Sequence, residues 1–163
     1  MSRAILWGLA VWALMVPGIA VADEAPAVDI KRLTLDSAVK VAQAAVADCA
    51  RRGIPVGVVV VDRGGHVQAA LRDTLAPDLT LRVAKDKAYT AMSFNVPTSQ
   101  LARRAKSPLG QLDGLVMSPG GLPIAAGGHI YGAVGVSGAP SGKTDEACAQ
   151  AGINTITEAL EFQ

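Results

Sequence analysis

The feature that most constrains the fold is an uninterrupted apolar run, Val56 to Val61, that leads directly into a turn. The run follows Pro55, is almost entirely valine and ends at Asp62, which is typical of a strand buried on both faces, or nearly so. Arg63-Gly64-Gly65 then reverses the chain, and residues 66–72 alternate apolar with polar side chains. The pattern predicts a β-hairpin.

The other predicted elements place helices on either side of this hairpin along the chain. Helical spacing of apolar residues begins after Thr34, a natural N-cap, and ends at Gly53. Further helices are expected at residues 79–94, 98–105 and about 144–160, and further strands at 115–117, 122–126 and 130–136. The order is therefore α-β-β-α-α-β-β-β-α. Short turns between paired strands favour an α+β fold with a mainly antiparallel five-stranded sheet, helices packed on it, and the two terminal helices on one face.

The first 22 residues have the features of a secretory signal peptide. Arg3 precedes an apolar run, Pro17 and Gly18 end it, and Ala20-Val21-Ala22 forms a small-x-small cleavage site before Asp23. The alternative is an uncleaved membrane anchor, which needs about 20 apolar residues, and this run is shorter. Cleavage leaves 163 − 22 = 141 residues and a formal charge of +1 − 1 = 0. We therefore expect an exported protein, periplasmic or extracellular, with a flexible arm at residues 23–32 and no membrane span after cleavage.

Export changes the interpretation of the two cysteines, Cys49 and Cys148. An oxidising compartment permits a disulfide between them. Each lies on a stripe of small residues, Cys49 in the first expected helix and Cys148 in the last, and two such stripes can approach closely. The alternative is a pair of unbonded, buried thiols, and the sequence favours the disulfide.

Composition and motifs exclude several function classes. A formal charge of +1 and 4% aromatic residues give no basis for nucleic-acid binding. Residues 137–144 nearly match a phosphate-binding loop, but Ser137 replaces its first glycine, and the loop comes too late in the chain for the parallel sheet of a nucleotide hydrolase. The sequence has no CxxCH, HExxH, paired-cysteine zinc or G-x-S-x-G motif. Two histidines alone cannot complete a zinc site.

A few side chains remain as candidates for chemistry. His66 and His129 each lie at a turn, where a solvated residue is the ordinary alternative. Tyr89 and Thr90 fall in the helix expected at residues 79–94, where ordinary packing is the alternative. Nearby basic residues would form a solvated face, or bind the carboxylates of a ligand. They are Lys85, Lys87, Arg103 and Arg104.

Several segments resemble the GlcG/HbpS family of small haem-binding proteins. The strongest are Gly120-Gly121-Leu122-Pro123-Ile124 and Gly132-Ala133-Val134-Gly135-Val136-Ser137-Gly138. Segments within residues 53–65, 87–91, 97–101 and 145–152 also match in the same order. The resemblance implies a profilin-like sandwich over residues 33–163, homo-oligomers, and non-covalent binding of haem or a related tetrapyrrole.

The resemblance also gives the candidate side chains a role. The haem-binding candidates are His129, His66 and Tyr89, whose nitrogen or oxygen atoms can ligate ferric haem, with Thr90 as a weaker oxygen donor. The propionate-binding candidates are Lys87, Arg103 and Arg104. Weak ligation at the surface is expected rather than a deep pocket, because the chain has few large side chains.

The leading hypothesis is an exported, non-covalent haem-binding protein that sequesters, presents or senses haem. Exported relatives are linked to sensing with a membrane kinase, so a membrane sensor or a transport protein would be its partner. Two alternatives stay open. One is a slow haem-degrading enzyme in which bound iron activates oxygen, and the other is a non-catalytic module that binds another small molecule or a sensor.

Overall fold

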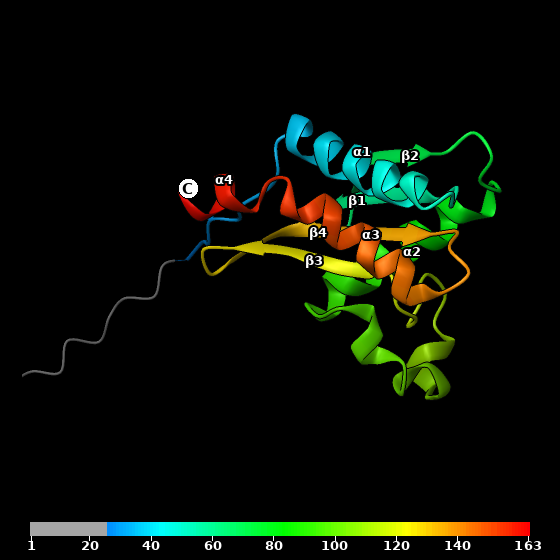
Figure 1. Cartoon of the computed structure of the whole chain (residues 1–163). Coiled ribbons are helices and arrows are strands. Elements are labelled where there is room, and N and C mark those ends of the chain that lie inside the picture. Colours follow the sequence, from blue (N-terminus) through cyan, green and yellow to red (C-terminus); the bar gives the residue numbers. More distant parts are fainter. Residues whose placement is uncertain (1–25) are drawn as a thin grey trace, which may run out of the picture.

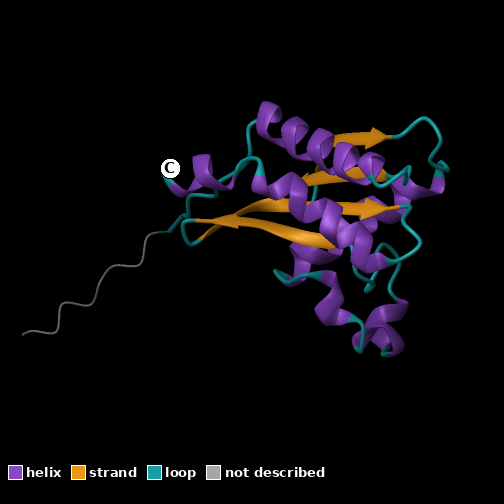
Figure 2. Ribbon diagram, in the orientation of Figure 1, coloured by secondary structure: helices purple, strands orange, loops and turns teal. Residues whose placement is uncertain are grey.

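A four-stranded antiparallel sheet forms the centre of the computed structural model, which describes residues 26–163. The strands are β1 (Gly57–Asp62), β2 (Val67–Arg72), β3 (Gly121–Ala126) and β4 (His129–Ser137), and they lie in the order β2-β1-β4-β3. Helices cover both faces of the sheet (Figure 1, Figure 2). They are α1 (Leu35–Arg51), α2 (Leu79–Phe94), α3 (Gly142–Asn154) and the short α4 (Thr157–Glu161).

Strand β1 shows how the two faces are covered. All six of its residues are buried. Val58 and Val60 belong to the apolar core that α1 and α3 share, whereas Val59 and Val61 contact the apolar side of α2. The prediction of a strand buried on both faces is therefore confirmed, as is the placement of the first and last long helices on one face (Figure 1).

Glycine at position 135 allows α2 to lie directly against β4. A Cβ atom at Gly135 would overlap the backbone oxygen of Ala84 and would lie 2.7 Å from the backbone nitrogen of Ala88. Neither backbone group can move without shifting the helix. The small residues of this strand therefore set the distance between the sheet and α2.

We expect Gly135→Ala to lower the free energy of unfolding by about 2–3 kcal/mol, because the added methyl group forces α2 away from the sheet. Chemical denaturation followed by circular dichroism measures the change. Ala125→Val, at an exposed position of the edge strand β3, is the control and should change the free energy by less than about 0.5 kcal/mol. Equal midpoints for Gly135→Ala and the wild type would contradict this close packing.

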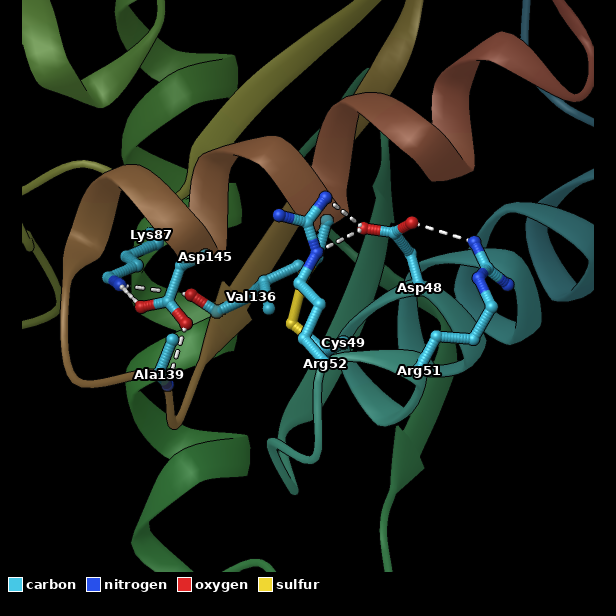
Figure 3. Close-up of a disulfide and its surroundings, with 9 residues drawn as sticks. Asp48, Cys49, Arg51, Arg52, Lys87, Val136, Ala139 and Asp145 are labelled. Carbon is cyan, nitrogen blue, oxygen red and sulfur yellow. Dashed lines mark hydrogen bonds and ion pairs between the residues drawn. A yellow bond between two sulfur atoms is a disulfide. The ribbon is translucent and has the colours of Figure 1, made fainter.

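The two long helices on the α1 face each begin at a side-chain cap, Thr34 as predicted for α1 and Ser141 for α3. The Thr34 side-chain oxygen accepts a hydrogen bond from the Ser37 backbone N–H at 3.2 Å, and Ser141 does the same for Lys143 at 3.2 Å. A disulfide between Cys49 and Cys148 joins α1 to α3, and neither cysteine is exposed (Figure 3). The covalent link fastens the two helices across the face that they cover together.

The expected fifth strand is absent among residues 26–163. Residues 115–117 form a loop instead, in which the Val116 backbone N–H donates to Thr90 Oγ1 at 2.9 Å and Met117 is buried. The Thr90 side chain of α2 thus accepts the Val116 N–H hydrogen bond that, in a sheet, a neighbouring strand would accept. The sheet therefore has four strands, and the prediction of five was wrong because residues 115–117 do not form a strand.

Two expected helices also differ from the structure. Residues 98–105 form two short 3-10 turns, Thr98–Leu101 and Arg104–Lys106, and a third follows at Pro108–Gln111. The single helix expected at 144–160 is divided into α3 and α4. Thr155 causes the break, because its backbone N–H and its hydroxyl both donate to the Gly152 carbonyl, at 3.1 and 2.7 Å.

The expected signal peptide at residues 1–22 lies outside the described residues. Residues 26–32 contain no helix or strand and are exposed. Within the part of the chain that the structure describes, no helix is long and apolar enough to cross a membrane.

Candidate functional site

Two turns and the segment before α1 meet at one end of the sheet. Asp62, the last residue of β1, pairs with Gly132, so the turn that follows β1 lies beside the start of β4. The β3–β4 turn lies at the same end, where Ala126 pairs with His129. Figure 1 shows the segment before α1 (blue) running past this turn (yellow).

These segments enclose an open hollow of about 500 Å³, which we call the arm hollow. Residues 28–31 form one wall, Arg63 from the β1–β2 turn forms another, and Gly128 from the β3–β4 turn with His129 and Ile130 at the start of β4 complete it. Its volume is in the range of small-molecule sites. The arm hollow is lined by three segments that are far apart in the sequence.

The lining of the arm hollow combines apolar side chains, two cations, one carboxylate (Asp29) and one imidazole. Val28 and Ile30 are 82% and 59% exposed, which is unusual for such large apolar side chains. Lys31 and Arg63 supply positive charge. The His129 ring is exposed, and the Tyr131 ring lies 6.5 Å from it between ring centroids in an edge-to-face arrangement. The hollow thus places one imidazole nitrogen beside apolar side chains, two cations and the Asp29 carboxylate.

Arg63 is held at this site by the end of α2. Its guanidinium donates to Asn95 Oδ1 at 3.2 Å and lies 3.9 Å from the sulfur of Met92. The adjacent acid, Asp62, fixes the turn itself, because Asp62 Oδ1 accepts from the backbone N–H groups of Gly64 at 2.8 Å and His66 at 3.0 Å. The β1–β2 turn is therefore a fixed wall of the hollow.

Burial and hydrogen bonding act in opposite directions on Asp62. Burial raises the pKa of its carboxyl, but the hydrogen bonds from the backbone N–H groups of His66 and Gly64 lower it. The charge of Arg32, whose guanidinium lies 3.5 Å from Asp62 Oδ2, lowers the pKa further. The net result is a pKa below the ordinary value, so Asp62 is ionised at neutral pH.

A second hollow lies on the other side of the same turn. It measures about 320 Å³ and is lined by Gly65, Lys85, Asp86, Tyr89, Asp113 and Gly114; we call it the Tyr89 hollow. A Cβ atom at Gly65 would lie 2.7 Å from the Tyr89 ring, so the turn packs directly on this tyrosine. The structure therefore places Tyr89 and His129 in two separate hollows that the β1–β2 turn divides.

His66 belongs to neither hollow. Its side chain is 80% exposed, and its Nδ1 lies 3.3 Å from Asp62 Oδ1. Arg103 and Arg104 are also exposed, and Arg104 lines a shallow hollow of about 210 Å³ beside Phe94 and Val96. The two arginines follow the first 3-10 turn, in the segment that projects from the sheet in Figure 1. They do not line either hollow that holds a candidate donor.

Thr90 and Lys87 face the interior, contrary to the roles expected for them. Thr90 is fully buried, and its hydroxyl donates to the Asp86 carbonyl at 2.6 Å while accepting from Val116. Lys87 is buried too and donates to Asp145 Oδ2 at 2.7 Å and to the Val136 carbonyl at 2.9 Å. Because these contacts already occupy both groups, neither presents a free donor or charge to a surface ligand in this structure.

The Lys87–Asp145 ion pair connects α2 to α3 across the end of β4 (Figure 3). The remaining carboxylate oxygen, Asp145 Oδ1, accepts from the Ala139 backbone N–H at 3.0 Å. Burial raises the pKa of Asp145, and the Lys87 and Ala139 hydrogen bonds oppose this without cancelling it. The pair is part of the fold rather than of either hollow.

Sequence reasoning missed residues 28–31 and Arg63 as parts of a site. The segment before α1 has no periodic pattern, and Arg63 was assigned only to a turn. The available signal was the pair of glycine-containing turns, since alternate turns of an antiparallel sheet meet at one end. Among the described residues, no group of three or more His, Cys, Asp and Glu side chains is placed to hold a metal ion.

The arrangement defines a class of small α+β domain with a central antiparallel sheet and open hollows at its end. A family model described as haem degrading protein HbpS-like matches residues 33–154. The chain belongs to this HbpS-like family.

Known proteins with similar sequences and structures agree with the family assignment. The crystal structure of HbpS has a TM-score of 0.75 and 40% identity, over 80% of this chain and 94% of that one. A PduOC:heme complex has a TM-score of 0.71 and 27% identity, over 77% and 95%. An uncharacterised 15.0 kDa protein from the dhaT–dhaS intergenic region of Citrobacter freundii is 36% identical over 117 residues, which is 67% of this chain and 82% of the relative.

Proposed function

We propose that this protein binds haem non-covalently in the arm hollow, with His129 as the iron ligand. The observation that carries the proposal is the exposed His129 ring in a hollow that also holds three apolar side chains and two cations, with Asp29 as its one acidic residue. A histidine nitrogen is a common axial ligand of haem iron in proteins. The family description and the PduOC:heme complex support a haem-related ligand.

The remaining groups of the arm hollow fit the other parts of a haem molecule. The apolar side chains of Val28, Ile30 and Ile130 would contact the flat macrocycle. Lys31 and Arg63 would pair with the propionate carboxylates, taking the role that the sequence had suggested for Lys87, Arg103 and Arg104. The openness of this site agrees with the weak surface binding expected from the sequence.

We further propose that the protein is exported and that it sequesters, presents or senses haem outside the cytoplasm. The leader pattern at residues 1–22 supports export, and so does the buried disulfide, because such bonds persist mainly in oxidising compartments. In this role the protein would release haem to a membrane sensor or transporter. An open hollow at the end of the sheet is suited to such a transfer.

Titration of the purified chain from Asp23 onward with hemin tests the proposal. We expect a saturable shift of the Soret band at micromolar protein, and loss of most of that shift in His129→Ala. His66→Ala is the matched control, because its imidazole lies outside the arm hollow and should leave the shift unchanged.

Two results of this titration would contradict the proposal. Absence of a saturable shift in the wild type would exclude haem binding under these conditions. Loss of the shift in Tyr89→Phe, with His129→Ala unaffected, would place the ligand in the Tyr89 hollow and would show that the assignment to His129 is wrong.

A second candidate function, slow degradation of haem, is favoured by the description of the matching family. When bound, haem iron supplies the redox chemistry that degradation requires. In this chain the residues of the arm hollow would hold and orient the macrocycle. Reductant and oxygen should then bleach the Soret band of the complex faster than that of free hemin, and an equal or slower rate would exclude this activity.

A further inference from the structure

The segment before α1 is fastened beside the arm hollow at two consecutive residues. The Arg32 guanidinium lies 3.5 Å from Asp62 Oδ2, and the Leu33 carbonyl accepts from Gln68 Nε2 at 3.0 Å. Leu33 itself is buried in the core. Arg32 and Leu33 therefore hold the C-terminal end of residues 28–31 at the edge of the hollow.

Asp62 connects this segment to the opposite wall. One of its oxygens holds the backbone of the β1–β2 turn, which carries Arg63, and the other pairs with Arg32. Its side chain is only 9% exposed, and its pKa lies below the ordinary value, so the negative charge is retained at neutral pH. One buried carboxylate thus sets the positions of two walls of the same hollow.

The apolar side chains of residues 28–31 lie outside the apolar core that the described residues form. Val28 and Ile30 line the arm hollow and remain 82% and 59% exposed. Exposed large apolar groups around a hollow mark a surface that another molecule covers. The arm hollow also holds an imidazole, two cations and the Asp29 carboxylate, a lining that suits a ligand with an apolar body, a metal centre and acidic groups.

We propose that residues 28–31 are a binding wall for haem, with Val28 and Ile30 against the macrocycle, and that the Arg32–Asp62 ion pair positions this wall. The inference rests on the proposed function and deepens it. It assigns a ligand-contacting role to the segment that the sequence indicated only as a flexible arm.

Hemin titration of two variants tests the wall and its attachment. Val28→Ser/Ile30→Ser should weaken hemin binding by roughly tenfold or more, because two apolar contacts are lost. Arg32→Gln should weaken it by about two- to fivefold, as expected for loss of one exposed ion pair. Both variants should keep the wild-type melting temperature within a few degrees, since the changed side chains are exposed.

Matched controls come from other parts of the molecule. Leu75→Ser/Leu79→Ser removes two apolar side chains of similar exposure, 80% and 56%, that do not line the arm hollow. Arg52→Gln removes a comparable exposed ion pair, with Asp48 on α1. Neither control should change hemin affinity. As a second readout, hydrogen exchange at the backbone amides of residues 28–33 should slow when hemin binds.

The outcomes separate this inference from the proposed function. If Val28→Ser/Ile30→Ser binds hemin like the wild type while His129→Ala does not bind, residues 28–31 are not a wall and haem binding at His129 stands. If exchange at residues 28–33 is unchanged by bound hemin, the wall is again excluded. If the wild type itself binds no hemin, the proposed function fails and the inference fails with it.

Discussion

Replacing Lys87 with methionine should destabilise the protein by about 3–5 kcal/mol at neutral pH, which is the cost of leaving a buried charge without its partner. Asp145 would keep one hydrogen bond, from the Ala139 backbone N–H, but would lose the ammonium group 2.7 Å away. Urea denaturation of the wild type and Lys87→Met measures the difference. Lys85→Met, on the exposed side of the same helix, should change the free energy of unfolding by less than about 0.5 kcal/mol.

The loss in Lys87→Met should depend on pH in a defined direction. The pKa of Asp145 is already raised in the folded protein, so its contribution to stability decreases as pH rises through that folded pKa. Without Lys87 the folded pKa rises further, and protonation at mildly acidic pH should recover part of the lost stability. A second change, Asp145→Asn, should recover part of it at neutral pH. A loss that is independent of pH, or a wild-type stability for Lys87→Met, would contradict a charged buried pair.

Removal of the disulfide should cost up to about 5 kcal/mol, because the bond closes a loop of about 100 residues and so restricts the unfolded chain. We expect Cys49→Ala/Cys148→Ala to unfold at a much lower denaturant concentration than the oxidised wild type. Reduction of the wild type under denaturing conditions, followed by refolding with reductant, should give a similar midpoint and serves as the control. If the double variant were as stable as the oxidised protein, the bond between α1 and α3 would have no role in stability.

The sequence predicted the elements whose ends carry strong local signals. The helix expected at residues 79–94 has the same limits as α2, because Asn95 adopts a left-handed conformation and Pro97 follows it. The β1–β2 hairpin was predicted from its valine run and its glycine turn. The break between α3 and α4 was not, because it depends on a threonine hydroxyl that bonds to its own helix. A strand was expected at the short apolar run of residues 115–117, but these residues form a loop in which Met117 is buried and Val116 bonds to Thr90 of α2.

The site was harder to predict than the fold. His129 and Tyr89 were identified as donors from their chemistry, but their separation into two hollows depends on the register of β1 with β4. The burial of Lys87 did have a signal, because it lies on the helical stripe of Ala84, Ala88 and Ala91 that faces the sheet. A lysine on such a stripe is easily assigned to the solvated face, since its buried partner, Asp145, is far away in sequence.

A crystal structure of the protein grown with hemin tests the central claim most directly. We expect one macrocycle in the arm hollow, its iron bonded to a nitrogen of His129 and its propionates near Lys31 and Arg63. Iron bonded to Tyr89 or His66, or a hollow at His129 that stays empty while hemin binds elsewhere, would contradict the account.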